Sequence, residues 1–183
     1  MISTPSVTEV LRIYQETQLR KVSPTVLLEA QERGQDFHRL AALYAQSLWI
    51  EDVPESCAGY FQSFTRWFDA MVVEVDVVEQ RLVHKVFHYT GTPDFIGRLK
   101  GDIANRTLID WKTPQTFSQT WRLQLAAYEQ LAKSSLAVGC LRVASLQPHP
   151  KGKRAKFREY TASLLSDFKV FLAALTVWRF LNA

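Results

Sequence analysis

Two acidic residues and one lysine stand out for the chemistry that their spacing allows. Asp94 follows a proline, and one residue, Trp111, separates Asp110 from Lys112. Side chains alternate along an extended chain, so Asp110 and Lys112 would share one face of a strand. Two carboxylates that approach each other raise each other's pKa unless a cation lies between them. Hard carboxylate oxygens suit Mg²⁺ or Mn²⁺, so the two acids predict a divalent metal site at which Lys112 would orient water or stabilise a charged transition state.

A predicted hairpin would bring these residues together. Residues 95–100 and 106–113 have the composition of strands, and Gly101-Asp102 lies in the connection between them. The two acids lie equally far from that turn, so antiparallel pairing would place them opposite each other. The alternative is a surface salt bridge between the lysine and one of the acids, which an isolated Asp-x-Lys triplet would fit equally well.

Hydrophobic periodicity predicts the remaining elements. Apolar residues recur at helical spacing in 6–18, 25–49, 55–70, 117–133 and 161–180. Valine density and alternation predict extended structure over 71–89, a turn at 91–93, and further strands at 137–146 and 157–160. This order predicts an α/β (α+β) fold in which a central mixed sheet is flanked by helices, with extra helices at the N-terminus.

The composition is that of a globular protein, with 183 residues, 47% of them hydrophobic and 22% charged. We expect a single domain with a helical N-terminal part (1–70), a catalytic core (71–146) and a basic loop followed by a C-terminal helix (147–183). The apolar runs are too short for a membrane span, and the N-terminus does not resemble a secretory signal. With only two cysteines, the chain is expected to be cytoplasmic, without a disulfide framework.

The net charge is +4, and its distribution is uneven. Five of the 22 Lys and Arg residues lie between His149 and Arg158, a stretch without an acid. Two interpretations remain open for it. It is either a solvated loop between two elements or an arm that contacts nucleic-acid phosphates. The residues of such an arm would be Lys151, Lys153, Arg154 and Lys156.

Four motifs occur in an order that resembles the PD-(D/E)XK nuclease superfamily. They are Gly34-x-x-x-His38, Gly91-Thr-Pro-Asp94, Asp110-x-Lys112 and Gln124-x-x-x-Tyr128. The first and last are typical of its RecB-like and phage exonuclease branch, and Pro5-Ser-Val-Thr-Glu-Val-Leu11 is similar to the first helix of that branch. The motifs from Gly34 to Tyr128 span about half of the chain. The resemblance implies a restriction-endonuclease-like core.

The resemblance also implies a set of metal ligands. His38, Asp94 and Asp110 would bind Mg²⁺ or Mn²⁺, and the backbone carbonyl of Trp111 would complete the metal shell. Glu79 is a further candidate acid, to orient the site or to hold a second metal, in competition with Glu74 and Asp76. An iron–sulfur cluster held by four cysteines is not expected, because the chain contains only Cys57 and Cys140.

In such a site Lys112 would position or activate water, while Gln124 and Tyr128 would shape the substrate side. The implied activity is that of a metal-dependent DNA nuclease, in our interpretation an exonuclease acting on DNA ends or single strands in recombination, repair or phage DNA processing. DNA is then the partner, and a recombination or helicase protein would fit as a second one. Two alternatives stay open. One is a structure-specific endonuclease or RNA-acting nuclease, and the other is a non-catalytic DNA-binding module of a larger complex.

Overall fold

The computed structural model describes residues 4–19, 23–137, 139 and 142–183. The helices are α1 (Val7–Leu19), α2 (Pro24–Ala45), α3 (Glu55–Met71), α4 (Thr120–Leu136) and α5 (Leu164–Leu181), with a 3₁₀ turn at Thr161–Ser163. The strands are β1 (Val72–Val78), β2 (Leu82–Val83), β3 (Thr90–Gly91), β4 (Phe95–Leu99), β5 (Asp102–Trp111), β6 (Arg142–Gln147) and β7 (Lys156–Glu159). No helix within these ranges is both long and apolar enough to cross a membrane.

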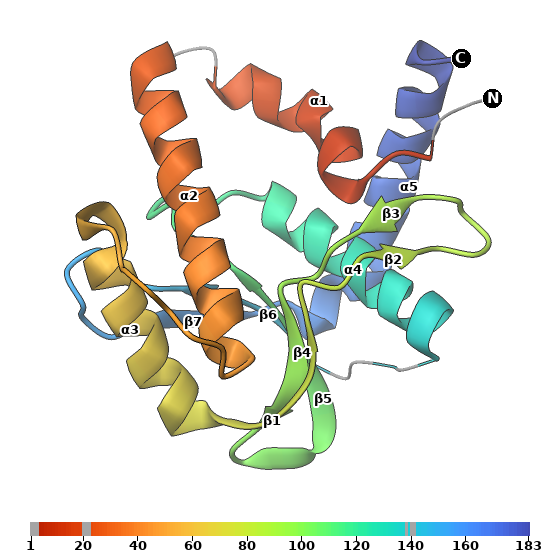
Figure 1. Ribbon diagram of the computed structural model, residues 1–183. Coiled ribbons are helices and arrows are strands. Elements are labelled where there is room, and N and C mark those ends of the chain that lie inside the picture. Colours follow the sequence, from red (N-terminus) through yellow and green to blue (C-terminus); the bar gives the residue numbers. More distant parts are fainter. Residues whose placement is uncertain (1–3, 20–22, 138, 140–141) are drawn as a thin grey trace.

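A five-stranded mixed sheet forms the centre of the molecule (Figure 1). Its strand order is β1-β4-β5-β6-β7; only β5 and β6 run parallel, and β2 and β3 form a separate two-stranded sheet. One face packs against α2 and α3, and the other packs against α1, α4 and α5. The expected α+β architecture, a mixed sheet flanked by helices, is therefore confirmed.

The β4–β5 hairpin has the register that the turn position predicted. Phe95 pairs with Ile109 and Ile96 pairs with Leu108, so the next pair outward is Asp94 with Asp110. Phe95 and Ile109 are buried toward α2 and α3, whereas Ile96 and Leu108 are buried toward α4 and α5. Because side chains alternate, the two aspartates lie on the α4 side of the sheet.

The prediction that the second helix extends to residue 49 is wrong. The backbone N–H of Gln46 still bonds to the carbonyl of Ala42, but Ser47 has a positive φ of 56°, which takes the chain out of the helix. Leu48 has helical spacing, yet its side chain is 52% exposed. The predicted helix was too long because Leu48 lies at helical spacing although it is not part of the buried face of the helix.

The prediction of continuous extended structure over 71–89 is also wrong. Met71 ends α3, and β1 ends at Val78, where the next residue, Glu79, has a positive φ of 47°. Gly91 lies in β3 rather than in a turn, because the chain reverses between β2 and β3 instead. At the other end of the hairpin, β5 begins at Asp102 and ends at Trp111, not at 106 and 113.

The elements of the C-terminal half lie close to their predicted ranges. The fourth helix is shifted by three residues at each end, and a 3₁₀ turn precedes α5. The expected edge strand is confirmed as β7. Residues 138, 140 and 141 of the strand predicted over 137–146 lie outside the described residues, and the described strand begins at Arg142.

Candidate metal centre and active site

Most of the motif residues line one cavity of about 550 Å³. It opens where β4 begins and β5 ends, between the middle of α2 and the first half of α4. Six residues expected from the sequence line it, namely His38, Asp94, Asp110, Lys112, Gln124 and Tyr128. The hairpin aligns the two aspartates, and the packing of α2 and α4 on the sheet supplies the other groups.

His38 forms the centre of a cluster that could hold a metal ion. Its Nδ1 lies 3.3 Å from Oδ1 of Asp94 and 3.4 Å from Oε1 of Glu79. The ligand atoms of the three side chains all lie within 4.8 Å of one another. One imidazole nitrogen and two carboxylate oxygens at this spacing are a suitable donor set for a divalent cation.

Of the three acids considered as a further member of the site, Glu79, Glu74 and Asp76, only Glu79 belongs to this cluster. Glu79 joins His38 because the chain turns sharply just after β1, at the residue's own positive φ of 47°. Glu74 instead pairs with Arg98 at 2.8 Å, and Asp76 pairs with Arg106 at 3.2 Å. Glu79 lies after the strand rather than within it, which corrects its predicted position.

Asp94 is held in place by the backbone of the partner strand. The N–H of Trp111 donates a hydrogen bond of 2.5 Å to Oδ2 of Asp94, leaving Oδ1 directed at His38. The Trp111 indole is buried on the opposite face, 5.1 Å from the ring of Phe64. The indole therefore anchors the end of β5 that positions the acid. The role of the Trp111 carbonyl as a metal ligand stays a prediction.

A second chain of contacts extends from Asp110 across the cavity. Lys112 forms an ion pair with Oδ2 of Asp110 and donates a hydrogen bond of 2.9 Å to Oε1 of Gln124. The amide nitrogen of Gln124 in turn donates to the hydroxyl of Tyr128 at 3.0 Å. The salt bridge named as the alternative is therefore present, but its side chains, Lys112 and Asp110, are 13% and 1% exposed, so it is not on the surface. The Lys112 ammonium is held between an acid and an amide inside the cavity.

The acids and the imidazole perturb one another strongly. Burial raises the pKa of Asp110, and Lys112 opposes that rise. Burial alone would lower the pKa of His38, but the Asp94 carboxylate, together with Glu79 and Asp110, raises it to about 10. Burial also raises the pKa of Tyr128 well above its usual value. In the metal-free site, the raised pKa keeps His38 protonated at neutral pH, and this positive charge balances the carboxylates. A bound divalent cation would balance the same carboxylates in its place.

Metal binding at His38 is therefore expected to release a proton. Since the pKa of His38 is about 10, the apparent affinity for Mn²⁺ should rise by about tenfold per pH unit between about pH 6.5 and 8.5. Titration calorimetry in two buffers of different ionisation enthalpy would measure the released proton directly. The His38→Gln variant should bind Mn²⁺ more weakly and with a flatter pH dependence. An unchanged pH dependence in this variant would show that His38 is not a ligand.

The basic loop between β6 and β7 lies apart from the cavity. Its backbone is anchored on α3, where the Ser63 hydroxyl donates to the carbonyl of Lys153 at 2.6 Å and Arg66 donates to the carbonyl of Gly152 at 3.2 Å. Lys151, Lys153, Arg154 and Lys156 are exposed, and none of them lines the metal cavity. Their contact with nucleic acid stays a prediction.

The lining also includes polar residues that the sequence did not indicate as functional, among them Ser6, Thr8 and Arg81. Ser6 and Thr8 come from the start of α1, and Arg81 comes from the segment after β1. Ser6 and Glu9 form a reciprocal capping pair, with hydrogen bonds of 3.2 Å and 2.7 Å, and their Ser-x-x-Glu spacing could have located this helix start. No sequence motif includes Arg81, because its position at the cavity depends only on how the segment after β1 packs in the folded chain.

Comparisons with known proteins give little beyond this geometry. No family model matches the chain, and no curated protein matches it. A solved structure described as "Crystal structure of SSO0001" is similar with a TM-score of 0.37 and 15% sequence identity, covering 94% of this chain and 72% of that chain.

Proposed function

We propose that the protein is a metal-dependent nuclease that hydrolyses DNA phosphodiester bonds, with a restriction-endonuclease-like core of the PD-(D/E)XK type. The observation that carries the proposal is the buried Lys112–Asp110 pair, which lines one open cavity together with His38 and Asp94, while Glu79 completes the cluster around His38. A site that only binds a metal would not need the buried Lys112. A salt bridge that only stabilises the fold would not need His38 beside it. Together they resemble a hydrolytic site for an anionic substrate.

His38, Asp94, Glu79 and Asp110 would hold the ion, which we propose to be Mg²⁺ or Mn²⁺. When bound, such an ion stabilises charge on a phosphodiester and lowers the pKa of water. The hydrogen bond from the Trp111 N–H fixes the orientation of the Asp94 carboxylate, and burial keeps Asp110 from being fully solvated. The same acids repel an incoming phosphate, so activity without the ion is not expected.

Lys112 would act on the attacking water. Its ammonium is fixed by Asp110 and Gln124, so it has one donor position left to direct into the cavity. There it can orient the water or stabilise the negative charge that develops on the phosphate oxygens. Gln124 and Tyr128 hold Lys112 from the α4 side and form the wall that a substrate nucleotide would meet.

We propose DNA ends or single strands as the substrate, and therefore an exonuclease. Lys151, Lys153, Arg154 and Lys156 are candidate phosphate contacts outside the cavity, and they would supply sequence-independent, salt-dependent affinity. A recombination, repair or phage DNA-processing role, with a recombination or helicase protein as a second partner, rests on this proposal and on the resemblance of the motifs.

The test is a cleavage assay on end-labelled single-stranded, linear duplex and closed circular DNA, and on RNA of the same sequence. We expect Mg²⁺- or Mn²⁺-dependent degradation of the linear DNAs and none in the presence of a chelator. Asp94→Asn is expected to abolish the activity, because the cluster loses a charged ligand while the hydrogen bond from Trp111 can remain.

The other outcomes each contradict part of the proposal. Cleavage of closed circles would show an endonuclease, and preferential cleavage of RNA would show a different substrate class. Binding of DNA without cleavage under any metal condition would show a non-catalytic module. Cleavage that persists in Asp94→Asn would place the chemistry elsewhere.

A further inference from the structure

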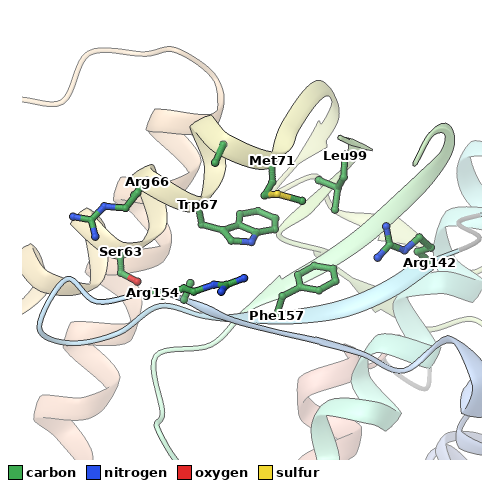
Figure 2. Close-up of a pocket in the computed structure, with 10 residues that line it drawn as sticks. Ser63, Arg66, Trp67, Met71, Leu99, Arg142, Arg154 and Phe157 are labelled. Carbon is green, nitrogen blue, oxygen red and sulfur yellow. The ribbon is translucent and has the colours of Figure 1, made fainter. Parts of the chain in front are cut away.

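A second cavity of about 530 Å³ lies between α3 and the strands β4, β6 and β7 (Figure 2). Its walls are mainly apolar, with Trp67 and Met71 from α3 and Leu99 from β4. The Trp67 and Phe157 rings are nearly parallel, with an interplanar angle of 15° and centroids 5.7 Å apart. A volume of this size accommodates a large apolar side chain together with its neighbours.

The charged groups of this cavity are all cationic. Arg66, Arg142 and Arg154 line it, and no Asp or Glu does so. Arg142 is held by Glu159 at 3.1 Å, and Figure 2 shows Arg142 and Arg154 on either side of Phe157. Among the described residues, Arg154 has no carboxylate within ion-pair distance, and it is exposed. The cavity therefore offers an apolar interior with a positive rim, on which Arg142 has an acidic partner while Arg66 and Arg154 form no described ion pair.

The strand that forms one wall of this cavity is open along one side. In the described sheet β7 is the last strand and pairs only with β6. Its exposed residues include Lys156 and Arg158, which add positive charge beside the free edge. A free edge can pair with an extended peptide through backbone hydrogen bonds. Alternate side chains of that peptide would then point toward Phe157 and the cavity.

This surface is remote from the metal centre. Asp94 precedes β4 and Leu99 ends it, and five residues of strand span about 16 Å. The two sites also use opposite faces of the sheet, because Leu99 belongs to the core formed with α2 and α3. The nucleotide held in the metal centre cannot reach this cavity, so its apolar interior does not take part in the proposed cleavage.

We propose that the cavity and the open edge of β7 bind an extended acidic peptide segment of a partner protein, which inserts one large apolar side chain beside Trp67 and Phe157. The acidic residues of the segment would pair with Arg154 and with Lys156 or Arg158. The apolar side chain supplies the buried anchor, and the rim of cations selects its acidic flanks. The free edge of β7 favours a peptide over single-stranded nucleic acid, because only a peptide backbone can pair with the edge of a sheet.

The experiment measures fluorescence anisotropy of a fluorescein-labelled peptide, Gly-Asp-Glu-Asp-Phe-Asp-Glu-Asp, in metal-free buffer. We expect saturable binding that weakens as salt increases and is lost when the phenylalanine is replaced by serine. Arg154→Glu removes a rim cation, and Ala70→Trp fills the cavity from an exposed position on α3. Each should weaken binding at least about tenfold. Lys169→Glu, at an exposed lysine on α5, is the matched charge control and should bind normally.

Three results would overturn the proposal. The first is the absence of saturable peptide binding to the parent protein. The second is binding that both Arg154→Glu and Ala70→Trp leave unchanged while their circular dichroism shows a folded chain. The third is binding of a labelled twelve-nucleotide thymidine strand that Ala70→Trp abolishes, which would identify the cavity as a nucleic-acid site. The assay contains no metal and measures no cleavage, so its outcome is independent of the proposed nuclease activity.

Discussion

Replacing Lys112 by alanine is expected to lower the rate of metal-dependent DNA cleavage by about 10²–10⁴-fold while leaving DNA affinity almost unchanged. The ammonium is fixed between Asp110 and Gln124 at the wall of the cavity, where it can act directly on a bound phosphate. Its loss removes charge stabilisation at the reacting phosphate but no residue of the metal cluster. Single-turnover cleavage with saturating enzyme, beside an anisotropy measurement of DNA binding, separates the two effects.

Two further variants make this result interpretable. Lys112→Arg retains the charge but replaces a compact ammonium by a planar fork, so partial activity is expected. Lys169→Ala, at an exposed lysine on α5, should cleave at the parent rate. Full activity in Lys112→Ala would show that the lysine only balances the charge of Asp110. An equal loss in Mn²⁺ affinity would show instead that the variant acts through the metal site.

Replacing Trp111 by alanine is expected to lower the free energy of unfolding by about 3–5 kcal/mol. The indole is 1% exposed, packs edge-to-face on Phe64 at 5.1 Å and lies 6.1 Å from the ring of His38. The cavity left behind would loosen the end of β5 and its hydrogen bond to Asp94. Metal affinity should therefore fall together with stability. Urea denaturation followed by far-ultraviolet circular dichroism measures the first effect.

Trp49 provides the matched control for this substitution. Its side chain is 86% exposed, so Trp49→Ala should change stability by no more than about 0.5 kcal/mol. Trp111→Phe should lie between the two, because it keeps an apolar ring in the same core. A Trp111→Ala variant as stable as the parent would contradict the assignment of this residue as the anchor of β5.

Local patterns predicted the elements with long, regular periodicity well. The aromatic helix predicted over 55–70 is found as α3 at Glu55–Met71, because its buried residues recur at the helical period on one face. The hairpin register also followed from the sequence, since Gly101 adopts a positive φ of 85° at the predicted turn. Both features depend on neighbours within about twenty residues, where spacing alone restricts the geometry.

Three of the boundaries that differ from the prediction have a common cause. Ser47, Glu79 and His88 adopt positive φ, and their residue types alone do not predict this conformation. These positions end α2, end β1 and turn the chain between β2 and β3. Tertiary contacts select such conformations, so a sequence pattern reports them only when glycine or asparagine occupies the position.

The sequence by itself determined which residues could do chemistry and that Asp94 would face Asp110, because strand alternation and turn position are local properties. Only the tertiary structure decided that Glu79, rather than Glu74 or Asp76, meets His38, since this depends on how α2 packs beside the end of β1. The same holds for Arg81 at the metal cavity and for the cationic rim beside Phe157. Periodicity specifies the face of each element, whereas the pairing of faces from distant elements is set by the packing of the whole core.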